Sequence, residues 1–146
     1  MTPLSPIGGF GPLSRSMATA ASGMRAQATR LRVTSENLAN VSSAAATPGG
    51  TPYRRKVISF AQAVDRATGA GLVQVSRISG DQTPFRRVYD PSHPAADAQG
   101  YVQMPNVSDV VELADSREAQ RSYEANLAML TQARTLFSKT LDILKA

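Results

Sequence analysis

Apolar and small side chains recur at alternating steps of four and three residues in the first part of the chain. This spacing places them along one side of an α-helix, as in the seam of a coiled coil. It predicts a helix over residues 14–41, capped by Ser14 or Ser16 and ended before Pro48, since proline cannot continue a helix. The seam positions are Met17, Ala21, Met24, Ala28, Leu31, Ser35 and Leu38.

A second stripe of the same period lies at the other end and predicts a helix from about Ser108 to Lys145. Acidic residues gather in its first turns and lysines near its end, which suits the helix dipole. Gln120 and Arg134 fall within this stripe and would be poorly accommodated in a dry core of two helices. The stripe comprises Leu113, Ser116, Gln120, Tyr123, Leu127, Leu130, Arg134, Phe137, Leu141 and Leu144.

The middle of the chain has short runs of β-forming residues separated by glycine and proline. The runs lie at residues 57–60, 72–75, 85–89 and 101–104. We therefore expect an α+β fold, in which two long terminal helices form an antiparallel coiled coil with a small β-rich insert between them. The expected parts are a flexible lead-in at 1–13, a coiled-coil domain at 14–41 plus 106–146, and a loop and β-rich middle segment at 42–105.

A chain of 146 residues has the size of one domain, and with 5% aromatic residues its core should be thin. A lone helix pair with seams of small residues would be marginal, so its ends should be partly unfolded in the isolated protein. The seams therefore pair within one chain, with other copies, or with both.

The chain has no cysteine, and therefore no disulfide or thiolate metal site. It also has no apolar run long enough to cross a membrane. Its first residues lack the features of a secretory signal peptide. We expect a protein that stays in the cytosol or leaves by a route that reads an uncleaved N-terminus.

Asp90, His93 and Asp97 are the one group that suggests catalysis or metal binding. The Asp-Pro-Ser-His-Pro sequence is also typical of a turn, because proline restrains φ and Asp or Ser caps the turn. With one histidine in the chain, we interpret this group as a turn. No catalytic, cofactor-binding or metal-binding residue is predicted.

The net charge is +5, with the basic excess before residue 91 and a mild acidic excess after it. Arg54, Arg55 and Lys56 form the main basic cluster and make a nucleic-acid-binding protein the alternative function. The cluster is also compatible with a solvated strand edge. A third interpretation is that at least one of the three pairs with an acidic residue at the start of the second long helix in a neighbouring subunit.

Several segments resemble a known family. Residues 35–40, Ser-Glu-Asn-Leu-Ala-Asn, are similar to the signature of the rod and hook proteins of the bacterial flagellum. Residues 51–57, 89–97, 104–107 and 121–126 resemble proximal rod members of that family. The family usually has threonine where this chain has Ser43, which keeps the hydroxyl for a turn or cap. The Pro/Gly-rich opening differs from the usual start of the family.

The resemblance implies a non-enzymatic subunit that polymerises helically with copies of itself and with other proximal and distal rod proteins to transmit torque. It also implies passage through the flagellar type III export apparatus without signal cleavage, and assembly in the periplasm. No cofactor, nucleic-acid partner or membrane insertion is expected. The expected assembly interface comprises Met17, Met24, Leu31, Asn37, Leu38, Asn40, Arg54, Arg55, Lys56, Tyr123, Asn126, Leu127, Leu130, Phe137 and Leu141.

Overall fold

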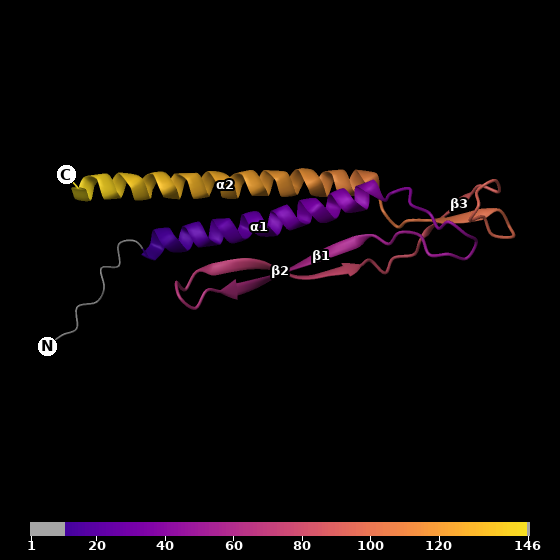
Figure 1. The fold of residues 1–146 in the computed structure, drawn as a ribbon, viewed down its shortest axis with the longest axis horizontal. Helices are drawn as coiled ribbons and strands as arrows, with labels where there is room; N and C mark the ends of the chain where they lie inside the picture. The colour runs from indigo at the N-terminus through magenta and orange to yellow at the C-terminus, as the bar shows by residue number, and fades with distance from the viewer. Residues whose placement is uncertain (1–10, 146) are drawn as a thin grey trace.

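The computed structural model describes residues 11–145. Two long helices lie side by side and antiparallel, and a long β-hairpin runs along α1 on a side that α2 leaves open (Figure 1). A second, smaller strand pair lies beyond the end of the helices where α1 stops and α2 starts (Figure 1). The elements are α1 (Gly11–Ala39), β1 (Lys56–Val64), β2 (Gly71–Gly80), β3 (Arg86–Tyr89), β4 (Tyr101–Met104) and α2 (Asp109–Lys145).

The start of α1 differs from the prediction. The helix begins at Gly11, so the lead-in expected at residues 1–13 is wrong for residues 11–13. Pro12 explains the early start, because proline is well suited to the first turn, where its missing N–H needs no partner. The remainder of the expected lead-in, residues 1–10, lies outside the described part of the chain.

The end of α1 is closed by side chains of the family signature. Nδ2 of Asn40 donates to the carbonyl of Glu36 at 2.8 Å, and the hydroxyl of Ser43 donates to Oδ1 of Asn40 at 3.0 Å. The first bond pairs a backbone carbonyl near the helix end, and the second holds the Asn40 side chain in place to make it. The turn role expected for Ser43 is confirmed.

The insert consists of two separate two-stranded antiparallel sheets. In the hairpin, Lys56 pairs with Gly80 and Val64 with Gly71, with a register shift between Ser59 and Phe60. Both strands extend well beyond the short runs predicted for them. In the smaller sheet, β3 pairs with β4. The expected α+β class, two long packed helices with a small β insert, is confirmed.

The core is thin, as the composition predicts. Most of its hydrophobic members are alanines, and the larger ones are three valines. Little apolar area is removed from water by such side chains, so hydrophobic burial contributes modestly for a chain of this length. The buried hydrophobic residues are Ala20, Ala26, Val33, Ala70, Ala95, Val102, Val107, Ala119 and Ala133.

Candidate assembly site

The seam between α1 and α2 differs from the predicted one by one residue on each helix. On α2 the buried residues are Glu112, Ala119 and Ala133, each one position before a predicted seam residue. On α1, Gly23 and Asn37 contact α2, and these positions come directly before Met24 and Leu38. One residue is a rotation of about 100° on a helix. The predicted seam is therefore wrong in phase, because the helices approach each other through small and hydrogen-bonded side chains instead of large apolar ones.

The large apolar residues predicted for the seam flank it. Met17, Met24, Leu31 and Leu38 on α1 are half-buried, as are Tyr123, Leu130 and Leu141 on α2. Leu127 and Phe137 are exposed, at 44% and 39%. Within residues 11–145, α2 carries most of the exposed large apolar residues outside the hairpin: Val110, Val111, Leu113, Leu127, Met129, Leu136, Phe137, Ile143 and Leu144.

Gly23 and Asn126 form the closest contact near the middle of the helix pair. A Cβ atom placed on Gly23 would lie 2.8 Å from Nδ2 and 2.9 Å from Oδ1 of Asn126. Nδ2 of Asn126 also donates to the carbonyl of Ser122 at 2.9 Å, so a movement of the amide away from Gly23 would break this hydrogen bond. A glycine at position 23 is therefore what allows α2 to pass this closely.

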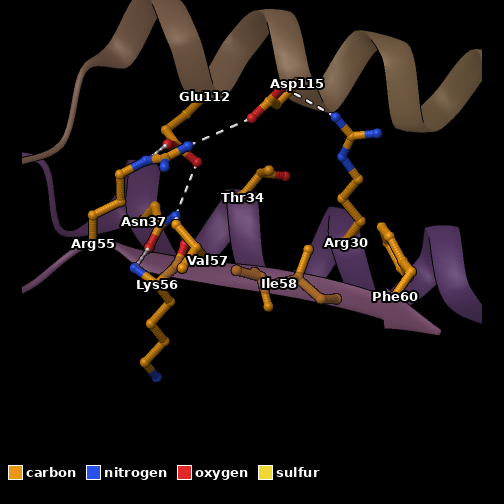
Figure 2. Close-up of a pocket in the computed structure, with 11 residues that line it drawn as sticks. Arg30, Thr34, Asn37, Arg55, Lys56, Val57, Ile58, Phe60, Glu112 and Asp115 are labelled. Carbon is orange, nitrogen blue, oxygen red and sulfur yellow. Dashed lines mark hydrogen bonds and ion pairs between the residues drawn. The ribbon is translucent and has the colours of Figure 1, made fainter. Parts of the chain in front are cut away.

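Polar side chains from three parts of the chain meet where α1 ends and α2 begins (Figure 2). Nδ2 of Asn37 donates to Oε2 of Glu112 at 2.9 Å and to the carbonyl of Lys56 at 2.8 Å. Its Oδ1 accepts from the backbone N–H of Lys56 at 2.8 Å and from the hydroxyl of Tyr53 at 2.9 Å. Nε of Arg55 donates to Oε1 of Glu112 at 2.6 Å. We call Asn37, Tyr53, Arg55, Lys56 and Glu112 the polar junction.

The polar junction buries a charged pair. The side chain of Glu112 is 0% exposed and that of Arg55 is 20% exposed. Burial alone would lower the pKa of Arg55, but the hydrogen bonds and charges of Glu112 and Asp81 outweigh it and raise this pKa. Burial, followed by the charges of Glu36 and Glu112, raises the pKa of Tyr53. Such a pair is tolerated in the interior only when its partners are all in place.

The basic cluster finds its partners within its own chain. Arg55 pairs with Glu112 and lies 3.5 Å from Asp115, both at the start of α2. Lys56 forms an ion pair with Glu36 on α1. Arg54 stacks over the ring of Phe85, 4.2 Å from its centroid. Arg55 thus meets the acidic helix start inside its own chain, and a pairing of the basic cluster with a neighbouring subunit stays a prediction.

The segment around His93 is a turn. Nδ1 of His93 accepts the backbone N–H of Ala95 at 3.1 Å, and Asp90 accepts from the backbone N–H and the hydroxyl of Ser92. Asp97 accepts the backbone N–H groups of Gln99 and Tyr101. These bonds lower the pKa of Asp90, chiefly through the Ser92 hydroxyl, and of Asp97, chiefly through Tyr101. The interpretation as turn chemistry agrees with this geometry.

A cavity of about 310 Å³ lies beside the polar junction, between α1, β1 and the start of α2 (Figure 2). Arg30 and Asp115 line it and pair with each other at 3.1 Å, while Ile58 and Phe60 line it from the hairpin. Across residues 11–145, no group of three His, Asp or Glu side chains is placed to hold a metal ion. Neither helix in this range is long and apolar enough to cross a membrane.

Both long helices match families of known proteins. A family described as "Flagella basal body rod protein" matches residues 17–44, and "Flagellar basal body rod FlgEFG protein C-terminal" matches residues 98–143. The FlgC flagellar basal-body rod protein of Agrobacterium fabrum is 48% identical over 135 residues, covering 92% of this chain and 97% of the relative. This chain belongs to the FlgC family.

Two further members of the FlgC family share less identity with this chain. The protein of Salmonella typhimurium is 43% identical, covering 85% of this chain and 92% of its own. That of Bacillus subtilis is 37% identical, covering 88% and 95%. The chain is thus a structural subunit of the flagellar basal-body rod, and nothing in these comparisons supports the nucleic-acid-binding alternative.

Two seam residues escaped the sequence analysis. Glu112 was assigned to the helix dipole and to pairing with a neighbouring subunit, but not to the seam, and Gly23 was not assigned at all. Small or polar residues recur every seven positions, at 112, 119, 126 and 133, and form a heptad repeat separate from the predicted apolar one. A glycine inside a helix pattern also indicates a close approach by a neighbouring backbone or side chain. These two signals together point to the seam that the structure has.

Proposed function

We propose that this FlgC-family chain acts by helical assembly and not by catalysis, and that the apolar surface of α2 is buried against neighbouring rod subunits. The exposure of large apolar residues on α2 carries this proposal. Val110, Met129, Ile143 and Leu144 are 70%, 60%, 76% and 69% exposed. A surface helix usually turns its large apolar residues toward its own core.

The asymmetry of the surface supports head-to-tail contacts. A helical polymer requires that one face of a subunit meets a different face of the next one. Large apolar residues are exposed on α2 and also on the hairpin, at Phe60, Val64, Val73 and Ile78. The hairpin and α2 do not pack on each other, so these are two unlike surfaces of one subunit. The partners in this proposal are copies of this chain and other proximal and distal rod proteins.

We further propose that the chain reaches the periplasm through the flagellar type III export apparatus without loss of a signal peptide. An export channel of this kind requires an unfolded chain. The thin core and the absence of cysteine favour easy unfolding and refolding without disulfide chemistry. Torque transmission would then depend on contacts formed after export.

The substitution Leu127→Glu tests the assembly surface. Leu127 is 44% exposed, so the purified variant should keep the circular dichroism and unfolding curve of the parent. In the rod, an unpaired carboxylate would be buried at the subunit contact, at a cost of about 2 kcal/mol or more per subunit. We expect secretion to continue while rods fail to assemble and swimming is lost.

Leu127→Met is the matched control, because it keeps an apolar side chain of similar volume. It should swim in soft agar as the parent does and yield basal bodies with rods. If Leu127→Glu is secreted at the parent level and also builds rods and swims normally, this part of α2 is not an assembly surface.

A further inference from the structure

Besides the ion pairs of Arg30 with Asp115 and Glu118, two specific contacts join α1 to α2, and these two have the same spacing on both helices. Gly23 faces Asn126, and Asn37 faces Glu112. Positions 23 and 37 lie two heptads apart, as do positions 112 and 126. Both contacts are therefore made in one register of the antiparallel pair, and a slide of the helices breaks both together.

Apart from the ion pairs of Arg30 with Asp115 and Glu118, the remainder of the seam does not select a register. Ala20, Ala119 and Ala133 are its other buried members, and alanines pack equally well against one another at any heptad. A slide of α2 by one heptad would place Ala119 opposite Asn37 and Ala133 opposite Gly23. Both methyl groups fit where Glu112 and Asn126 now lie, so packing alone would tolerate the slipped pair.

The two specific contacts oppose this slide in different ways. After it, Asn126 would face Arg30 and not Gly23, and its amide would meet a long side chain where the glycine now leaves room. Arg55 and Asn37 would lose Glu112, and a partly buried guanidinium would be left with fewer partners. The polar junction thus penalises wrong registers even if it contributes little net stability in the correct one.

We infer that Asn126 and Glu112 act together as a register key for the helix pair, Asn126 by fitting only opposite Gly23 and Glu112 by pairing only with Asn37 and Arg55. Register matters here because α2 contacts α1 and not the hairpin, so the seam alone sets where the exposed residues of α2 lie relative to the hairpin. The inference concerns a single chain. Its test needs no rod, so its failure and that of the proposed assembly surface are distinguishable.

Cysteine cross-linking can measure the register directly, because the native chain has no cysteine. Ala20 and Met129 line the same small cavity, so Ala20→Cys with Met129→Cys reports the native register. Ala20→Cys with Leu136→Cys, one heptad further along α2, reports the slipped one. Each pair is placed in the purified full-length chain and treated with a short bismaleimide.

In the parent background we expect the native product to dominate and the slipped product to be rare. The key is then removed by Asn126→Ala with Glu112→Met and Arg55→Met, which replaces the buried charges by apolar side chains of similar length. Arg30→Met is placed in parent, variant and control alike, because the ion pairs of Arg30 with Asp115 and Glu118 would also hold the register. The slipped product should rise about tenfold. Arg77→Met with Glu124→Met is the matched control, since it removes an exposed arginine and an exposed glutamate elsewhere and should leave the ratio unchanged.

The inference would be overturned if the slipped product were as rare in the variant without the key as it is in the parent. It would also fail if the parent formed no native product, since the key would then not act within one chain. Should the triple variant fail to fold, Gly23→Ala gives a second reading. Gly23→Ala should reduce the native product, and adding Asn126→Ala to it should restore that product. Gly71→Ala, whose added methyl group meets no atom within 4 Å, is the control and should have no effect. An undiminished native product in Gly23→Ala would also overturn the inference.

Discussion

The two halves of α2 are used in opposite ways. Near its start, Glu112 is fully buried and bonded to two other parts of the chain, and Asp115 pairs with Arg30. Beyond Leu127, the hydroxyls of Thr131, Thr135 and Thr140 donate to carbonyls of the same helix. Ala133 is the buried residue of that half within the described range. One end of the helix pair is bonded to other parts of its own chain, although Val110, Val111 and Leu113 are exposed there, and the other end carries most of the exposed large apolar residues of α2.

This difference separates folding from assembly along one helix. Interactions that specify the subunit are concentrated at the polar junction, where a short segment before β1 joins both helices. Surface that a neighbouring subunit can cover is concentrated in the second half of α2, which also extends past the start of α1 (Figure 1). A rod subunit with this arrangement can adopt its own shape first and complete its burial afterwards.

Removal of one member of the buried pair should have the largest effect on the closed end. Arg55→Met leaves Glu112 charged, buried and without its cation, which should lower the free energy of unfolding by about 3–5 kcal/mol. Chemical denaturation followed by circular dichroism measures this loss. Arg77→Met, which truncates an exposed arginine on β2, should cost less than about 0.5 kcal/mol. Equal losses in the two variants would show that the polar junction is not special.

Acid should weaken the closed end before the open one. The hydrogen bond from Lys56 lowers the pKa of Glu36 from its usual 4.5, and hydrogen bonds from Thr83, with Arg55 adding to them, lower that of Asp81 from 3.8. A lowered folded-state pKa means that the charged form stabilises the fold above the usual pKa. This stabilisation disappears as the pH falls through the lowered folded-state value.

Hydrogen exchange of the purified chain at neutral pH and at about pH 3 measures this effect. Protection should fall in the first half of α2 relative to its neutral value, and less so beyond Leu127. A variant with Glu36→Gln and Asp81→Asn should show a smaller acid effect. Equal loss along the whole of α2 would contradict the assignment of acid sensitivity to the junction end.

Truncation at the open end should have the smallest effect on stability. Ile143 is 76% exposed, so Ile143→Ala should change the free energy of unfolding by less than about 0.5 kcal/mol. Val107, which precedes α2 and is 1% exposed, is the comparison, and Val107→Ala should cost about 2 kcal/mol. Thermal unfolding of both variants measures the difference. A cost for Ile143→Ala as large as that for Val107→Ala would mean that the open end is packed within the subunit.

Local patterns in the sequence were sufficient for the architecture. Heptad spacing at both ends predicted two long helices whose ends agree with α1 and α2 to within a few residues. Short β-type runs predicted the insert, and the Asp-Pro-Ser-His-Pro segment predicted a turn. Each of these properties depends on neighbouring residues, so a single chain read in order reveals them. The signature around Asn37 and Asn40 further indicated the family.

The phase of the seam and the partner of Arg55 were decided by tertiary structure. Large apolar residues at Met24 and Leu127 marked one face of each helix, but a contact between helices also depends on how closely their backbones can approach. Gly23 and the alanines permit a closer approach, and Glu112 is acceptable inside because Asn37 and Arg55 meet it there. Asn37 and Arg55 come from segments that are far from Glu112 in sequence, so no local pattern predicts that the three side chains meet. The sequence by itself determined the helices, whereas the fold determined which of their faces the chain covers and which it leaves exposed.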